Sequence, residues 1–453
     1  MMLAAKIALA RVAGALSRRT GRGGTSLPGK LLIRIEPHAM ARLSSRLRDG
    51  SAVISATNGK TTTAAMVSAI LEGSGARLVH NRAGANMAGG VTTALLDAAR
   101  GSGIDASAGL FEVDEFWLEQ VVPQLRPRAL LLSNLFRDQL DRYGELETIA
   151  DRWACAVAAA PATHLVLNAD DPLVADLGRD RANVTYFGVQ DDGVALDGLA
   201  HASDSKHCRR CGAPYVYDAV YLGHLGRYHC PNGDGPRPEP EVWASAIALD
   251  GTRGAAFDLH VGAQRARVTL ALPGLYNVYN AVGAAALAHA LGASLEAIAR
   301  GLAATRAAFG RAETVLVGDR ELAILLVKNP AGANEVLRTL ALDPGELDVL
   351  AVLNDRTADG HDVSWIWDAD FELLSDRVRR VTCSGTRAAE LAVRLKYAGV
   401  PAERLHVVPA LADGLDGALS DGDGRLVAMP TYTAMLELRA LLVARGAAAG
   451  SFA

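Results

Sequence analysis

This sequence of 453 residues lacks three features: an apolar run of transmembrane length, a disulfide framework of cysteines and a large net charge. No stretch reaches the roughly 18–20 uninterrupted apolar residues that a transmembrane helix needs. Five cysteines, three of them clustered, do not form the framework of a secreted, disulfide-stabilised domain. The formal net charge of −4 argues against a dedicated nucleic acid binder. These absences favour a globular protein, for which the length predicts about three domains.

The N-terminal segment has an amphipathic pattern. Residues 2–16 are mostly apolar, are interrupted by Lys6 and Arg11, and are followed by Arg18 and Arg19. No small-residue cleavage site follows cleanly, so we interpret the segment as an amphipathic helix and not as a signal peptide. Two alternatives stay open: the helix packs on the fold, or it touches an anionic membrane surface.

The most informative motif is Ser55-Ala56-Thr57-Asn58-Gly59-Lys60-Thr61-Thr62-Thr63, which lies between an apolar run and a helical pattern. A glycine turn between a strand and a helix presents free N–H groups at the positive helix end, where phosphate binds. The general phosphate-loop pattern has a glycine five positions before the Gly-Lys pair, and Ile54 stands there. A plain strand-to-helix turn is therefore the alternative.

On the nucleotide-binding interpretation, each polar residue of this motif has a role. Lys60 reaches the outer phosphates, and the hydroxyl of Thr61 or Thr62 faces a magnesium ion. We therefore predict that the chain binds ATP and Mg²⁺. The expected loop residues are Thr57, Asn58, Gly59, Lys60, Thr61 and Thr62.

A carboxylate follows the next apolar run. Glu112 lies near the end of the predicted strand 109–113, where side chains of a parallel sheet face the ligand crevice. Carboxylate oxygens are suitable ligands for magnesium. We predict Glu112 as a metal ligand, although Asp114 and Glu115 make a solvated acidic loop the alternative.

The order of elements predicts two α/β units. Apolar strand candidates at 52–55, 109–113, 129–133, 164–168 and 184–187 alternate with helical runs over 51–190, which indicates a parallel sheet covered by helices. A second series of strands and helices over 322–445 predicts a smaller, Rossmann-like domain. The expected divisions are a helical segment 1–50, a central ATP-binding domain 51–314 and a C-terminal domain 315–453, with an insertion at 201–237.

The insertion contains the cysteine cluster. Cys208 and Cys211 have the spacing of a zinc knuckle, and Cys230 follows about twenty residues later. Gly233 stands where a fourth cysteine would complete the site. We predict structural zinc on the three thiolates; the alternative is a ribbon held by packing alone. The fourth ligand is open among His207, His224, His229 and Asp234.

Several of these stretches resemble the Mur ligase and folylpolyglutamate synthase superfamily. The string 57–63 resembles its nucleotide loop, and 133–144 resembles a stretch with a metal-binding histidine, here replaced by Gln139. The turn 168–172, the helix start 274–281 and the linker 310–313 resemble segments that contact nucleotide. The resemblance implies nucleotide contacts from Asn168, Asp171, Asn277, Asn280 and Arg311.

Other features depart from the amino-acid-adding ligases of that superfamily. Ala56 stands where those enzymes usually carry glycine, and the region 153–156 lacks the lysine that they carbamylate. Only about fifty residues precede the nucleotide loop, so we expect the chain to lack the usual domain for a UDP-linked precursor. We therefore expect a trimmed metal site and a substrate that is not held through UDP.

Three C-terminal strings, 328–334, 353–368 and 429–435, together with the cysteine ribbon, resemble the MurT family of lipid II isoglutaminyl synthase subunits. That resemblance implies ATP-dependent amidation of D-glutamate in the lipid II stem peptide, with ammonia from a GatD-type glutaminase. Lys60 and Arg311 would neutralise the transferring phosphoryl group. An aspartate would complete the partner's glutaminase triad, and Asp355 is our choice over Asp359, Asp362 and Asp368.

Two other functions stay open at this point. One is a ligase that adds a whole amino acid to a folate or peptidoglycan precursor, and the other is a non-catalytic ATP-binding scaffold. For each of the three candidate functions, we expect a cytoplasmic protein that is at most peripheral at the inner face of the membrane. We expect it not to bind nucleic acid.

Overall fold

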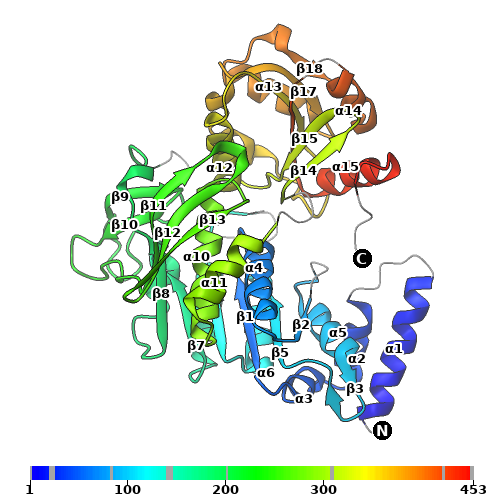
Figure 1. The fold of residues 1–453 in the computed structure, drawn as a ribbon, viewed down its shortest axis with the longest axis vertical. Helices are drawn as coiled ribbons and strands as arrows, with labels where there is room; N and C mark the ends of the chain where they lie inside the picture. The colour runs from blue at the N-terminus through cyan, green and yellow to red at the C-terminus, as the bar shows by residue number, and fades with distance from the viewer. Residues whose placement is uncertain are drawn as a thin grey trace.

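The computed structural model describes residues 3–19, 26–81, 85–138, 146–199, 203–306, 311–420 and 424–448. Figure 1 shows a helical layer at one edge, a large central sheet and a smaller sheet above it. No helix among these described residues is long and apolar enough to cross a membrane.

The helical layer is built from the first part of the chain. Its helices are α1 (Leu3–Arg19), α2 (Leu27–Ile35) and α3 (Ala39–Ser44). They pack on α5 (Ala88–Ala98), and α2 approaches α5 so closely that a Cβ on Gly29 would lie 1.9 Å from Gly89 O. Glycine is therefore needed at that crossing, because any side chain would separate the two helices.

The central sheet has nine strands in the order β13-β12-β11-β8-β7-β6-β1-β5-β2. It is parallel from β2 to β11, which confirms the parallel sheet predicted over 51–190 and extends it by β11. The next two strands, β12 and β13, are antiparallel. The strands are β1 (Ser51–Ser55), β2 (Leu78–His80), β5 (Ala108–Glu112), β6 (Ala129–Leu132), β7 (His164–Asn168), β8 (Val184–Val189), β11 (Val242–Leu249), β12 (Ala255–Val261) and β13 (Gln264–Leu270). A short hairpin, β3 (Ala99–Arg100) with β4 (Gly103–Ile104), lies beside it.

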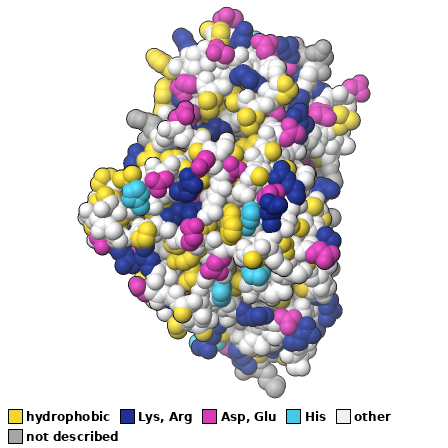
Figure 2. Space-filling model, turned by 60° about the vertical axis from the view of Figure 1, so that its left-hand side comes forward, with side chains coloured by type: hydrophobic (Ala, Val, Ile, Leu, Met, Phe, Trp, Pro, Cys, Tyr) yellow, Lys and Arg dark blue, Asp and Glu magenta, His cyan; other side chains and the backbone are white. Residues whose placement is uncertain are grey.

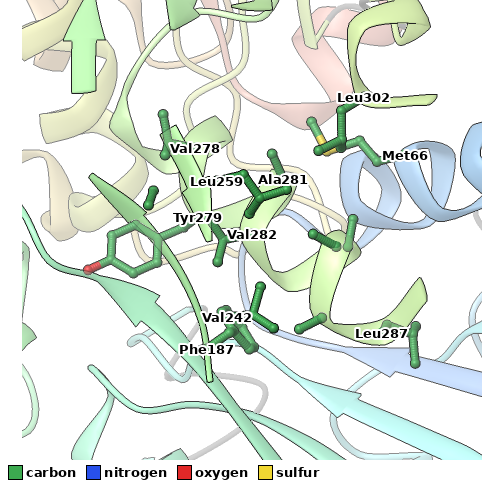
Figure 3. Close-up of a cluster of buried hydrophobic side chains, with 14 of the residues drawn as sticks. Met66, Phe187, Val242, Leu259, Val278, Tyr279, Ala281, Val282, Leu287 and Leu302 are labelled. Atoms are coloured by element: carbon green, nitrogen blue, oxygen red, sulfur yellow. The ribbon is translucent and has the colours of Figure 1, made fainter. Parts of the chain in front are cut away.

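Both faces of the parallel part are covered, which explains its nearly continuous apolar strands. Alternate residues of β1 point to opposite sides: Ile54 joins the cluster under α4, α10 and α11, whereas Val53 joins the cluster under α5, α6 and α8. Figure 3 shows α10 in the first cluster, where Val282 lies among Phe187, Leu259 and other side chains. The covering helices are α4 (Lys60–Gly73), α6 (Leu118–Leu125), α8 (Leu146–Ala158), α9 (Pro172–Asp176), α10 (Leu275–Ala290) and α11 (Leu295–Ala304).

An antiparallel hairpin interrupts this series, in the segment where cysteine, histidine and glycine break the strand–helix alternation. It consists of β9 (Val216–Leu222) and β10 (Leu225–His229) and forms a sheet of its own. Its turn residue His224 is fully buried against the central domain, with its ring centre 4.9 Å from that of Phe136. The turn of the hairpin therefore packs into the core.

The second sheet has six strands in the order β14-β15-β19-β16-β17-β18. Only β14 is antiparallel to its neighbour, so the parallel remainder has the Rossmann-like pattern predicted from sequence. The strands are β14 (Arg311–Val317), β15 (Arg320–Leu325), β16 (Leu347–Val352), β17 (Val378–Ser384), β18 (Leu405–Val407) and β19 (Leu426–Pro430); the helices are α12 (Pro330–Ala341), α13 (Ala388–Tyr397), α14 (Leu411–Ser420) and α15 (Tyr432–Ala444).

Candidate active site

The predicted phosphate loop joins β1 to α4 at the carboxyl edge of the parallel sheet. Gly59 has a φ of 85°, in the left-handed region that favours glycine. A Cβ there would also lie 2.0 Å from Asn280 Oδ1 on α10. Both the backbone and the space around it therefore require glycine, and the loop leaves the first N–H groups of α4 facing the cavity described below.

Lys60 is buried at the start of α4, with acidic side chains around it. Its Nζ donates to Glu115 Oε2 at 2.8 Å and to Ala56 O. Burial would lower the pKa of Lys60, but Glu115, Asp114 and Glu112 outweigh that effect and raise the pKa. Lys60 is therefore a permanent cation in this site.

The pKa values of two acids near Lys60, Asp114 and Glu115, are shifted in opposite directions. Burial and the neighbouring charge of Glu115 raise the pKa of Asp114. Burial would also raise the pKa of Glu115, but Lys60 and Lys328 lower it below its ordinary value. Glu115 is therefore the fixed counter-ion of the lysine, while Asp114 has the weaker preference for charge.

Thr61 and Glu112 meet beside the loop. Thr61 Oγ1 donates to Glu112 Oε2 at 2.8 Å. The Glu112 backbone is held by Asn81, which accepts from Glu112 N at 3.0 Å and donates to Glu112 O at 2.7 Å. A hydroxyl and a carboxylate at a phosphate loop are the protein ligands that suit Mg²⁺, so this pair has the donor set predicted for the metal.

The C-terminal domain closes over the loop through the turn between β15 and α12. Asn329 forms two amide hydrogen bonds with Asn58, at 3.0 and 3.3 Å. Lys328 Nζ pairs with Asp138 and donates to Thr57 O at 3.4 Å. A second lysine, from the other domain, thus reaches the phosphate loop.

These elements enclose one cavity of about 400 Å³. Its lining includes the predicted residues Thr57, Asn58, Gly59, Lys60, Thr61, Thr62, Glu112, Asn277 and Asn280. On α10, Asn280 donates to Asn277 Oδ1 at 3.1 Å, and Thr63 donates to Asn280 at 3.3 Å. The α10 amides are therefore tied to the first turn of α4.

Other predicted nucleotide contacts lie outside the cavity lining. Asn168 and Asp171 are fully buried. Asp171 caps α9 and accepts from Leu135 N at 2.8 Å, so it supports the segment after β6. The side chain of Arg311, and all of Gln139, lie outside the described residues.

The cysteine cluster is assembled as the spacing predicts. The sulfur atoms of Cys208, Cys211 and Cys230 all lie within 4.8 Å of one another, a donor set that fits a soft metal such as zinc. Among the suggested fourth ligands, Asp234 contacts the cluster through its carbonyl oxygen, 3.2 Å from Cys208 Sγ. His224 lies at the turn of the hairpin and pairs with Asp171 at 3.4 Å.

The four C-terminal aspartates lie in different surroundings. Asp355 follows β16 and accepts from Thr386 Oγ1 and Arg387 Nε, both at 2.8 Å. These hydrogen bonds lower the pKa of Asp355, which is partly exposed. Asp359 is buried and accepts from Thr433 N at 2.8 Å at the start of α15. The remaining two are Asp362, which accepts from Ser364 N at 2.8 Å, and Asp368, which lies 3.4 Å from Arg137.

Sequence reasoning missed the contribution of the C-terminal domain to the loop. Lys328 and Asn329 follow a strand and precede a helix, which is the same arrangement as at the phosphate loop. That order was the available signal. The surface that Lys328 and Asn329 face depends on how the two sheets pack against each other, and no local sequence pattern encodes that packing.

Solved structures with the same fold define the class of protein. A pseudomurein peptide ligase type C from Methanothermus fervidus superposes with a TM-score of 0.68 at 23% identity, over 89% of this chain and 80% of that one. The MurF ligase of Thermotoga maritima, solved in complex with ADP, has a TM-score of 0.64 at 12% identity, over 91% and 83%. These likenesses define the fold of this chain as that of the Mur ligases.

Sequence comparisons define the family more closely. The Mur ligase middle domain matches residues 54–232, and the MurT ligase C-terminal domain matches residues 326–435. The chain is 33% identical over 437 residues to lipid II isoglutaminyl synthase subunit MurT of Streptococcus pneumoniae, covering 94% of each chain. It is 32% identical to the same subunit of Staphylococcus aureus, covering 95% and 96%. This chain therefore belongs to the MurT family.

Proposed function

We propose that this chain is the ATP-dependent synthetase subunit that converts D-glutamate in the lipid II stem peptide to D-isoglutamine. The observation that carries the proposal is the full-length similarity to MurT, joined to a phosphate loop that retains its lysine, hydroxyl and carboxylate. The α-carboxylate attacks the γ-phosphorus of ATP, which releases ADP and leaves an acyl phosphate. Ammonia then attacks the carbonyl carbon and phosphate leaves.

The roles of the cavity residues follow from their chemistry. The N–H groups of the loop and Lys60 bind the phosphates, and Lys60 stabilises charge on the transferring group. Thr61 and Glu112 would hold Mg²⁺, which would neutralise phosphate charge when bound. We assign nucleotide contacts to Thr57, Asn58, Gly59, Thr62, Asn277, Asn280 and Arg311, and a supporting role behind the cavity to Asn168 and Asp171.

We further propose that the ammonia comes from a GatD-type glutaminase in a heterodimer or larger complex. Asp355 is our choice for the residue that this chain contributes to the partner's site. Its partly exposed carboxylate, with a lowered pKa, supports that choice over Asp359, whose carboxylate is buried at a helix start. The Arg137 pair of Asp368 and the local hydrogen bond of Asp362 make them weaker candidates.

Structural zinc on Cys208, Cys211 and Cys230 is part of the proposal. So is the division into a helical segment 1–50, a central domain 51–314 and a C-terminal domain 315–453, with β14 leading from the second into the third. We place the protein in the cytoplasm, peripheral at the inner face of the membrane.

Amidation of lipid II tests this function against its two rivals. The purified chain is supplied with ATP, Mg²⁺ and either ammonium or glutamine, with and without a GatD-type glutaminase, and product and phosphate are measured. We expect amidation with ammonium alone, and with glutamine only when the glutaminase is present. Incorporation of an added amino acid would favour the amino-acid ligase, and no turnover with either nitrogen source would favour the scaffold.

A further inference from the structure

The outer surface of α1 has an unusual composition. Every exposed residue of this helix from Leu3 to Leu16 is apolar: Ala4, Ala5, Ala8, Leu9, Val12, Ala15 and Leu16. The three large side chains are strongly exposed, Leu9 by 50%, Val12 by 58% and Leu16 by 59%. A surface helix of a globular protein normally turns polar residues outward. This helix instead has apolar residues on both its inner and its outer side.

The opposite side of α1 explains how the helix is held. Leu3, Ile7 and Ala10 are buried in the core of the helical layer. On the flanks, Lys6 pairs with Glu36 at 2.8 Å, and Arg11 donates to Leu96 O at 2.6 Å. Packing and polar contacts thus account for the inner side and the flanks, and they do not use the outer stripe. Figure 1 shows α1 as the outermost helix at this edge of the molecule.

Charge is concentrated in the same part of the chain. Residues 1–48 contain ten lysines and arginines and a single acid, Glu36, a formal charge of +9. Because the whole chain carries −4, the remaining residues carry −13. Within the layer, Lys30 and Arg34 on α2 are exposed. Figure 2 shows a different face, where basic and acidic side chains are interspersed.

From this stripe and this charge we propose that α1 and α2 bind the surface of an anionic lipid bilayer. An apolar helical stripe beside cationic residues enters the boundary between headgroups and acyl chains, and basic residues are attracted to anionic lipids. The surplus of nine positive charges selects such a surface over a neutral one. It also argues against a second copy of the chain, because two such layers facing each other would repel.

The inference extends the proposed function and rests on it only in the following step. The second helix of the layer packs on α5, and Met87, the residue before α5, lines the active-site cavity. Leu27 at the start of α2 is 45% exposed, and Met87 is 36% exposed. A bilayer bound along this layer therefore lies close to an edge of the cavity, which suits a lipid-linked substrate.

Vesicle flotation of the full-length protein tests the surface. We compare phosphatidylcholine vesicles with vesicles that also contain phosphatidylglycerol, at low and high salt. The test variant is Val12→Glu with Leu16→Glu. The matched control is Leu316→Glu with Tyr397→Glu, which alters hydrophobic residues that are at least as exposed (60% and 75%) in the C-terminal domain. A third variant, Lys30→Glu with Arg34→Glu, changes the charge and leaves the stripe intact. Circular dichroism melting verifies that each variant folds.

We expect salt-sensitive binding to the anionic vesicles only, weakened about tenfold or more by the stripe variant, reduced by the charge variant and unchanged by the control. Absence of binding, or equal loss in the control, would overturn the inference. So would a dimer, or a glutaminase complex, that the stripe variant dissociates, since a protein would then cover α1. Vesicle binding without lipid II amidation would contradict the proposed function and leave the membrane surface standing.

Discussion

At the residue scale, the pair of Lys60 and Glu115 combines the catalytic task that we propose for Lys60 with a structural one. Both side chains are about 10% exposed, and the ammonium and carboxylate are 2.8 Å apart. Removing one member of a buried ion pair leaves an uncompensated charge, at a cost of about 3–5 kcal/mol. A lysine variant alone therefore confounds lost catalysis with lost stability.

Replacing both members of the pair separates the two effects. We expect Lys60→Met to lower ATP-dependent phosphate release by about 10²–10³-fold, because a cation at the transferring phosphoryl group is lost. Lys60→Met with Glu115→Gln should recover much of the thermal stability and none of the activity. Phosphate release and melting temperature are measured on both proteins. Substantial activity in the double variant would show that the loop does not hold the reacting phosphates.

Lys328 is a second cation at the same loop, and its role can be separated from that of its neighbour. Asn329 holds Asn58 through two amide hydrogen bonds, while Lys328 reaches Thr57 O and lowers the pKa of Glu115. We expect Lys328→Met to lower kcat for phosphate release by about ten- to a hundredfold, with Lys328→Arg close to wild type. Asn329→Ala should instead mainly raise the KM for ATP. If both variants show the same kinetic pattern, Lys328 acts only as a contact between the two domains.

At the element scale, the cysteine ribbon connects the proposed zinc site to the cavity wall. Two strands lead from the thiolates to a turn whose flanking residues, Leu222 and Leu225, line the cavity. When the metal is removed, the base of this hairpin loses its cross-link. We expect the turn to become more mobile, because both strands connect it to that base.

Removal of the metal should therefore weaken nucleotide binding. We expect Cys230→Ser, or treatment with a zinc chelator, to raise the dissociation constant for ATP severalfold, with zinc content falling in parallel. Cys155→Ala is the matched control, since that cysteine lies on α8 and does not belong to the cluster. Zinc content is measured by atomic absorption and affinity by calorimetry. Unchanged affinity in a zinc-free protein would show that packing alone holds the turn.

The elements differ in how far the sequence predicted them. The buried parallel strands β1, β5, β6 and β7 were predicted within a residue or two, since their apolar runs are short and bounded by turns. The strands β12 and β14 were not predicted. Polar residues alternate with apolar ones along β12, a half-buried strand pattern that a prediction from continuous apolar runs misses, and β14 lies at the edge of its sheet. The loop residues Lys60 and Thr61 were predicted by spacing, whereas Lys328 became a site residue only through domain packing.

At the scale of the whole molecule, the proposed partners correspond to three different surfaces. The cavity lies between the two sheets, the apolar stripe lies on the outermost helix, and Asp355 lies beyond the end of β16 on the second sheet. A lipid-linked substrate, ATP and an ammonia source would thus approach from separate sides. Such a division predicts that the ammonia-dependent and glutamine-dependent reactions can be separated by mutation.

Asp355→Asn provides that separation. The variant keeps a side chain of the same size, whose amide oxygen can still accept from Arg387 and whose NH2 group can donate to the Thr386 hydroxyl. It loses the negative charge that a partner's histidine would need. In the complex with a GatD-type glutaminase, we expect glutamine-dependent amidation of lipid II to fall by about 10²-fold or more, whereas ammonium-dependent amidation by the same preparation stays near wild type. Asp362→Asn is the matched control, because its carboxylate is also exposed and makes only a local hydrogen bond to Ser364. A loss of both reactions in Asp355→Asn would place the residue in the synthetase site or in its folding. Loss of the glutamine reaction in Asp362→Asn alone would move the triad role to Asp362. Since ammonia bypasses the partner's chemistry entirely, the ratio of the two rates isolates the contact between the subunits from every step at the phosphate loop.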